Sequence, residues 1–190
     1  MTGDEVLELL RESGAQQEGH FLLSSGLHSS QYLQCALVLE DPPSAERLGR
    51  ELAARLCQPP EAVLSPALGG VIIGHEVARA AGARFLFTER DPARQNRTTL
   101  RRGFALRRGE RVVVVEDVVT TGRSTREVIE VAQAAGAEVR AVAAIVDRSG
   151  GAAQFGVPFV SLLSLEVPAF TPAECELCRR GVPLEKPGSR

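Results

Sequence analysis

Apolar positions along this chain follow two different spacings. Helical spacing recurs in residues 4–13 and 43–57, from Val71 to about Ala81, and after Thr125. Short apolar runs typical of buried strands fall at residues 62–64, 84–87, 112–115, 138–146 and 158–165. Two further short strands are predicted around the Ser/Gly turn within residues 19–34, whereas residues 168–190 show no clear period. Strands that alternate with helices favour an α/β fold with a mostly parallel central sheet.

The most informative segment, residues 111–125, reads RVVVVEDVVTTGRST. Four β-branched valines predict a strand that is buried on both faces, and the run ends in two carboxylates, Glu116 and Asp117. A turn rich in hydroxyls and glycine follows, and then an amphipathic helix. Free amides at a helix start favour an anion, so the pattern predicts a phosphate site. Carboxylates accept hydrogen bonds from the vicinal hydroxyls of a ribose. A buried strand with a solvated acidic pair is the alternative.

Two other segments fit a phosphate ligand. Residues 65–70 (SPALGG) lie between a strand and a helix and form a weaker anion cradle, without the G-x-G-x-x-G spacing of a dinucleotide site. Residues 88–102 (TERDPARQNRTTLRR) are polar and have no apolar period. We interpret them as a lid whose Arg90, Arg94 and Arg97 close over a polyphosphate, with a solvated loop as the alternative.

Composition narrows the functional class. The chain has 190 residues, 44% apolar and 24% charged, and a net charge of −2, which provides no general attraction to nucleic acid or to anionic membranes. The first residues do not resemble a signal peptide, and no apolar run approaches the roughly 20 residues of a membrane span, so a cytoplasmic protein is expected. Lys186 is the one lysine, which excludes a P-loop.

The four cysteines give no clear metal site. Cys35 and Cys57 each stand alone among apolar neighbours and are predicted to be packed thiols. Cys175 and Cys178 have the C-x-x-C spacing of half a zinc site, but no second Cys or His pair lies nearby in the sequence. We expect two reduced thiols in a turn, with a zinc site shared between two chains as the alternative.

The segment VVVVEDVVTTGRST resembles the phosphoribosyl-diphosphate signature of type I phosphoribosyltransferases. The resemblance implies their fold: a mostly parallel central sheet flanked by helices, with a small N-terminal hood. It also implies one domain over residues 1–190, in which residues 1–40 and the tail form the hood and residues 43–165 the core. In that family the two acids hold the ribose hydroxyls and the turn surrounds the 5'-phosphate.

Other segments are similar to orotate phosphoribosyltransferases in particular. They are GHFLLSSGLHSSQYL for the hood, SPALGGVIIG for the diphosphate loop, FTER…LRRGF for the mobile catalytic loop and IVDRSGG for the base site. The residues implied for phosphoribosyl diphosphate are Ala67, Leu68, Gly69, Gly70, Arg90, Glu116, Asp117, Val118, Val119, Thr120, Thr121, Gly122, Arg123 and Ser124. The residues implied for orotate are Ser24, Tyr32, Leu33, Thr120 and Arg148. Catalytic roles fall to Arg90, Glu116 and Asp117.

The resemblance further implies Mg²⁺ bound through the substrate phosphates, with no direct protein ligand, and a homodimer whose loop reaches the neighbouring site. Ser24 and Gly69 stand where the family commonly has lysines, and the loop carries arginines in place of lysines and a histidine. Because arginine stays protonated, the identity of any general acid is open. A purine-type phosphoribosyltransferase and a non-catalytic regulator that binds phosphoribosyl diphosphate are the alternatives.

Overall fold

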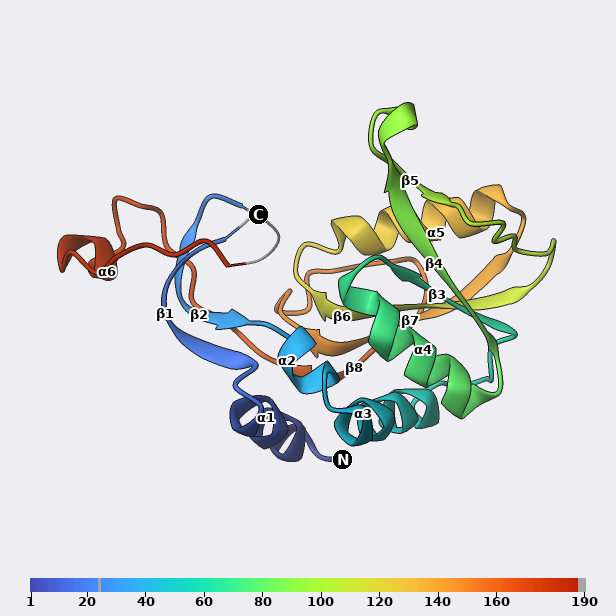
Figure 1. Cartoon of the computed structure of the whole chain (residues 1–190), viewed down its shortest axis with the longest axis horizontal. Coiled ribbons are helices and arrows are strands. Elements are labelled where there is room, and N and C mark those ends of the chain that lie inside the picture. Colours follow the sequence, from blue (N-terminus) through green and yellow to red (C-terminus); the bar gives the residue numbers. More distant parts are fainter. Residues whose placement is uncertain (24, 188–190) are drawn as a thin grey trace.

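The structure is a computed structural model that describes residues 1–23 and 25–187. Its centre is a six-stranded sheet in the order β5-β4-β3-β6-β7-β8 (Figure 1). The strands are β3 (Ala62–Pro66), β4 (Arg84–Asp91), β5 (Arg97–Leu100), β6 (Arg111–Val119), β7 (Glu138–Asp147) and β8 (Phe159–Ser164). All neighbouring pairs are parallel except β4 with β5. The predicted α/β fold with a mostly parallel sheet is therefore confirmed.

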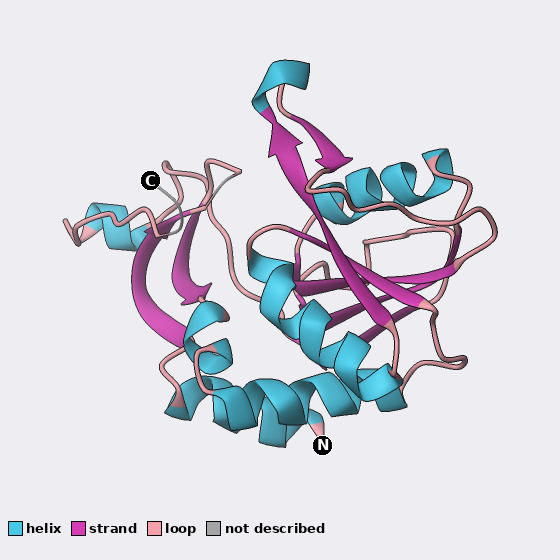
Figure 2. Ribbon diagram, turned by 45° about the vertical axis from the view of Figure 1, so that its right-hand side comes forward, coloured by secondary structure: helices cyan, strands magenta, loops and turns pink. Residues whose placement is uncertain are grey.

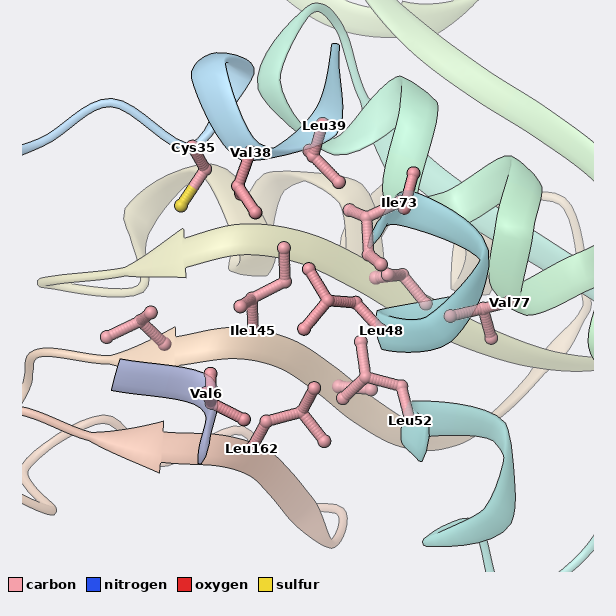
Figure 3. Packing of buried hydrophobic residues seen from close by; sticks show 14 of the residues in the cluster. Val6, Cys35, Val38, Leu39, Leu48, Leu52, Ile73, Val77, Ile145 and Leu162 are labelled. Carbon is pink, nitrogen blue, oxygen red and sulfur yellow. The ribbon is translucent and has the colours of Figure 1, made fainter. Parts of the chain in front are cut away.

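Helices cover both faces of this sheet (Figure 2). The helices are α1 (Gly3–Glu12), α2 (Ala36–Leu39), α3 (Pro42–Ala54), α4 (Gly69–Ala81) and α5 (Arg123–Ala134). A further short helix, α6 (Glu176–Arg179), lies in the tail, away from the sheet (Figure 1). The valines of β6 alternate between two apolar cores. Val113 and Val115 pack with residues of α1, α3 and α4, among them Val6, Leu48 and Ile73 (Figure 3), whereas Val112 and Val114 pack with residues of α5. This burial on both faces explains why the strand has four valines in succession.

The hood is a separate antiparallel pair, β1 (Gln16–Leu22) and β2 (His28–Leu33). The tail, residues 168–187, is ordered against it although its sequence has no period. Phe170 bridges to His28 and Glu185 bridges to Phe21, so each edge of the hairpin carries a short stretch of the tail. Backbone hydrogen bonds to a neighbouring strand explain this order, because they do not depend on the side-chain pattern.

The segment 88–102 is mostly strand, which differs from the predicted irregular lid. β4 continues through Thr88 to Asp91 and pairs with β5, so the segment forms a β-hairpin that projects from the sheet edge (Figure 2). We call residues 88–102 the arm. At its tip Gln95 and Asn96 have φ values of 55° and 56°, a left-handed pair that reverses the chain. Among the described residues, no helix is both long and apolar enough to cross a bilayer.

Candidate active site

Two adjoining cavities lie where β6 ends and α5 begins. The smaller, about 570 Å³, is lined by the turn after β6, the start of α5 and two residues of the arm. The larger, about 720 Å³, lies between that turn and the hood. Both cavities include Val118, Thr120, Thr121 and Arg123 in their walls. The carboxyl edge of the sheet thus offers two neighbouring compartments, as expected for a ligand site in an open α/β fold.

The first compartment has the features of a phosphate site. Its lining includes the last two residues of β6 and the turn predicted to hold the phosphate: Val118, Val119, Thr120, Thr121, Gly122, Arg123 and Ser124. Gly122 caps α5 with a φ of 71°, and a Cβ there would lie 2.8 Å from the ring of Phe155. The residue must therefore be glycine for two reasons, backbone conformation and space. Because the first amides of a helix have no internal acceptor, the start of α5 supplies donors for an anion.

The two acids at the end of β6 have different surroundings. Glu116 is only 4% exposed, and its Oε1 accepts a hydrogen bond of 2.6 Å from the Ser124 hydroxyl. Burial, together with the nearby charge of Asp117, raises the pKa of Glu116 to about 8. Asp117 lines the larger cavity and accepts a 2.9 Å hydrogen bond from the Val118 amide; burial raises its pKa as well. Asp117 thus faces the cavity directly, whereas Glu116 forms part of neither cavity wall.

The turn predicted to bind diphosphate reaches the site from the side. Ala67, Leu68, Gly69 and Gly70 are outside the lining of both cavities. Gly69 nevertheless lies against Asp117, because a Cβ added to Gly69 would be 2.8 Å from both carboxylate oxygens. Gly70 is equally close to the Val115 carbonyl. This crowding gives a physical reason for glycine at position 69.

The hood side of the larger cavity carries the residues predicted for the base. Tyr32 and Leu33 of β2 lie on its wall with Arg148, which follows β7. Arg148 is half-buried, and its buried Nε has no hydrogen-bond partner among the described residues. Desolvation by burial lowers the pKa of this guanidinium. An uncompensated cation in such a place favours an anionic ligand. Ser24, also predicted for the base, lies outside the described residues.

The arm lies against the phosphate compartment of its own chain. Arg90 lines the smaller cavity, forms an ion pair of 2.7 Å with Glu127 of α5, and donates to the Asn96 carbonyl. Thr98 also donates to Glu127, at 2.6 Å. Partial burial opposes ionisation of Glu127, but the Thr98 hydrogen bond and the positive charges of Arg90 and Arg123 lower its pKa. Arg97 is exposed, and the structure does not describe the side chain of Arg94.

Comparison with known proteins agrees with this geometry. The family model "Phosphoribosyl transferase domain" matches residues 38–170, which is more than half of the chain. The chain belongs to the phosphoribosyltransferase family. It is 55% identical to the orotate phosphoribosyltransferase of Heliobacterium modesticaldum over the full length of both chains. It is 52% identical to that of Thermotoga maritima, over 97% of this chain and 98% of the relative.

Solved structures support the same assignment. The orotate phosphoribosyltransferase from Aeropyrum pernix is 30% identical and superposes with a TM-score of 0.68, covering 84% of this chain and 93% of that one. The Mycobacterium tuberculosis enzyme in complex with inorganic phosphate is 28% identical with a TM-score of 0.65, covering 85% of this chain and 94% of that one. The resemblance inferred from the sequence is therefore confirmed.

This phosphoribosyltransferase also has features that its sequence did not reveal. Lys186 and Pro187 of the tail line the larger cavity, which Arg148 also lines. A single lysine in a tail without apolar periodicity is the one sequence feature that points to Lys186, and nothing in the sequence indicates that it lies at the site. The cysteine interpretation needs two corrections. Cys57 is exposed, not packed, and Cys175 and Cys178 do have a second pair beside them, His20 and His28.

Proposed function

We propose that this phosphoribosyltransferase transfers the 5-phosphoribosyl group of phosphoribosyl diphosphate to N1 of orotate, with release of diphosphate. The observation that carries the proposal is the pair of cations, Arg148 and Lys186, in a cavity that adjoins a phosphate turn. Orotate is a flat pyrimidine with a carboxylate. A half-buried guanidinium whose Nε has no hydrogen-bond partner in the described part of the chain suits this carboxylate better than it suits an uncharged purine base. The names of the full-length relatives support the same reaction.

The sugar phosphate takes the smaller compartment and its border with the larger one. The amides and hydroxyls of residues 120–124 hold the 5'-phosphate, and Asp117 accepts from the ribose hydroxyls. Glu116 joins Asp117 in this role when its Ser124 hydrogen bond is exchanged for a ribose hydroxyl. The turn 67–70, which abuts Asp117, holds the diphosphate together with Arg90.

The base takes the larger compartment. Arg148 pairs with the carboxylate of orotate, and Lys186 contributes a second positive charge on the same cavity. Tyr32 and Leu33 cover the ring from the hood, and Thr120 provides a hydrogen bond at the border with the sugar. N1 of the base then lies beside C1' of the ribose, and these are the two atoms that the reaction joins.

The oxygen donors at this border fit Mg²⁺. Carboxylate and hydroxyl oxygens are the ligands that this ion prefers, and it usually binds through substrate phosphates with few protein ligands. The Asp117 carboxylate and the Thr120 and Thr121 hydroxyls are of that class. When bound, Mg²⁺ would neutralise charge on the diphosphate leaving group. Positive charge grows on the ribose as C1'–O weakens, and closure of the arm excludes water that would otherwise capture this centre.

We further propose that the chain acts as one domain in a cytoplasmic homodimer, in which the arm assists the neighbouring site. Arg90 pairs with Glu127 of its own chain in this structure, so assistance across a dimer requires this ion pair to open. Sedimentation of the full chain measures the oligomeric state. A purely monomeric protein with full activity would contradict the shared arm.

The reaction is tested by mixing the protein with Mg²⁺, phosphoribosyl diphosphate and orotate and measuring orotidine 5'-phosphate. The control is the double variant Glu116→Gln/Asp117→Asn, which we expect to be inactive. Parallel reactions with adenine, guanine and hypoxanthine separate the purine-type alternative. Binding of phosphoribosyl diphosphate without turnover on any base would instead support a regulator. Full turnover in the presence of a chelator would contradict the dependence on Mg²⁺.

A further inference from the structure

Four side chains with metal-ligating atoms meet outside the active site. His20 of β1, His28 of β2, and Cys175 and Cys178 of the tail place their ligating atoms within 4.8 Å of one another. His20, His28 and Cys175 are buried, with exposures of 2%, 5% and 1%. Cys178 lies at the surface and leaves an entry path for an ion. Two imidazoles and two thiols are the ligand set of a structural zinc site.

The spacing of these atoms is close to tetrahedral. Zinc lies about 2.0–2.1 Å from nitrogen and about 2.3 Å from sulfur, so its tetrahedral ligands are about 3.3–3.8 Å apart. His20 Nε2 lies 3.0 Å from His28 Nδ1 and 3.4 Å from Cys175 Sγ. Cys178 Sγ lies 3.6 Å from His20 Nε2 and 3.2 Å from His28 Nδ1. These four separations run from slightly below that range into its middle, and all pairs of ligating atoms in the set lie within 4.8 Å.

Hydrogen bonding alone does not account for the cluster. His20 Nδ1 lies 2.8 Å from the Val182 carbonyl and must donate to it, which leaves Nε2 with one lone pair and no proton. That single lone pair faces three neighbours: His28 Nδ1, Cys175 Sγ and Cys178 Sγ. One acceptor cannot bond all three, whereas one cation at the centre contacts all four groups. A histidine that binds a metal through one ring nitrogen usually donates a hydrogen bond from the other, often to a backbone carbonyl, as His20 does.

We propose that His20, His28, Cys175 and Cys178 of one chain bind a structural Zn²⁺ ion. The ion joins the hood to the tail, which otherwise meet through backbone hydrogen bonds such as His28 with Phe170 and Leu22 with Glu185. Short segments of this kind cannot bury a large core, and a metal supplies the missing stability. The inference does not depend on the reaction proposed above.

The first experiment measures metal content. Full-length protein is reduced, reconstituted with excess Zn²⁺, desalted and analysed for zinc by mass spectrometry. We expect about one zinc per chain. The matched control is Cys57→Ser, which changes an exposed thiol that is not part of the cluster and should retain the metal. The double variant Cys175→Ser/Cys178→Ser should lose it. Absence of zinc from the reduced wild-type protein, or equal zinc in the double variant, would overturn the proposal.

A second measurement covers the case in which the double variant does not fold. Wild-type protein loaded with Co²⁺ should show a thiolate-to-cobalt charge-transfer band and visible absorption of tetrahedral geometry, and Cys57→Ser should show the same. Hydrogen exchange of wild-type protein should accelerate on zinc removal at residues 168–187 and at His28, but not in β6. The absence of the cobalt spectrum, or hydrogen exchange unaffected by zinc, would contradict a zinc site.

Discussion

Arg148 offers the sharpest separation between a binding role and a structural role. The Nε of its half-buried guanidinium has no hydrogen-bond partner among the residues that the structure describes, and burial lowers the pKa of the group. Arg148→Gln removes the charge and keeps much of the volume. A hydrogen bond to a charged group contributes about 1.5–3 kcal/mol, which corresponds to about a tenfold to a hundredfold change in affinity. We expect KM for orotate to rise by that factor.

The same substitution should not destabilise the ligand-free protein, because it removes a half-buried charge whose Nε has no hydrogen-bond partner in residues 1–23 and 25–187. The matched control is Arg140→Gln, which changes an exposed arginine on β7, the strand that Arg148 follows; its ion-pair partner is Glu138. Steady-state kinetics with each substrate varied, together with urea unfolding, measures both effects. An unchanged KM for orotate, or a lower free energy of unfolding for Arg148→Gln than for Arg140→Gln, would refute the reasoning.

Three further predictions concern the sugar-phosphate side. Gly69→Ala places a Cβ 2.8 Å from both carboxylate oxygens of Asp117 and should lower kcat/KM for phosphoribosyl diphosphate at least tenfold. The control is Gly3→Ala, whose Cβ would lie 3.7 Å from its nearest neighbour, Leu163, and which should leave the kinetics unchanged. The pKa of Glu116 is about 8 in the folded protein, against 4.5 when unfolded, so between these pH values the folded state holds a proton that the unfolded state has lost. The free energy of unfolding of the wild-type protein should therefore fall as the pH rises from 4.5 to 8. Glu116→Gln should reduce this decline when unfolding is measured as a function of pH. Arg90→Gln breaks the ion pair with Glu127 and should lower kcat in turnover assays. The free energy of unfolding should change by no more than about 1 kcal/mol, because half of the Arg90 side chain is exposed to water. An unaltered kcat would remove Arg90 from the catalytic role.

The active-site strand could be predicted because its signals are local. Four valines, two acids and a Thr/Gly turn lie within fifteen residues, and each follows from its neighbours: burial on two faces, the end of the strand, and the start of a helix. Asp117 and Arg148 belong to different segments, yet the rule that parallel strands end at one edge predicts that they meet. The structure places both on one cavity wall.

Other features depend on contacts between distant segments. His20 and Cys175 are separated by 155 positions, so their pairing has no sequence signal, and the cysteines were judged without their histidine partners. The tail shows no apolar periodicity because backbone hydrogen bonds attach it to the hood, and such bonds do not require particular side chains. Lys186 reaches the base compartment only through that docking. The sequence predicts an irregular arm because its strand residues are mostly polar and lack apolar alternation, although most of them are partly buried in the structure.

The central claim is that the activated sugar phosphate binds at the end of β6. A crystal structure of the protein with Mg²⁺ and phosphoribosyl diphosphate tests it most directly. The account predicts ribose hydroxyls within hydrogen-bond distance of Glu116 and Asp117, and the 5'-phosphate on the amides of residues 121–124. A pentose bound elsewhere, with this turn and both acids free of ligand, would contradict it.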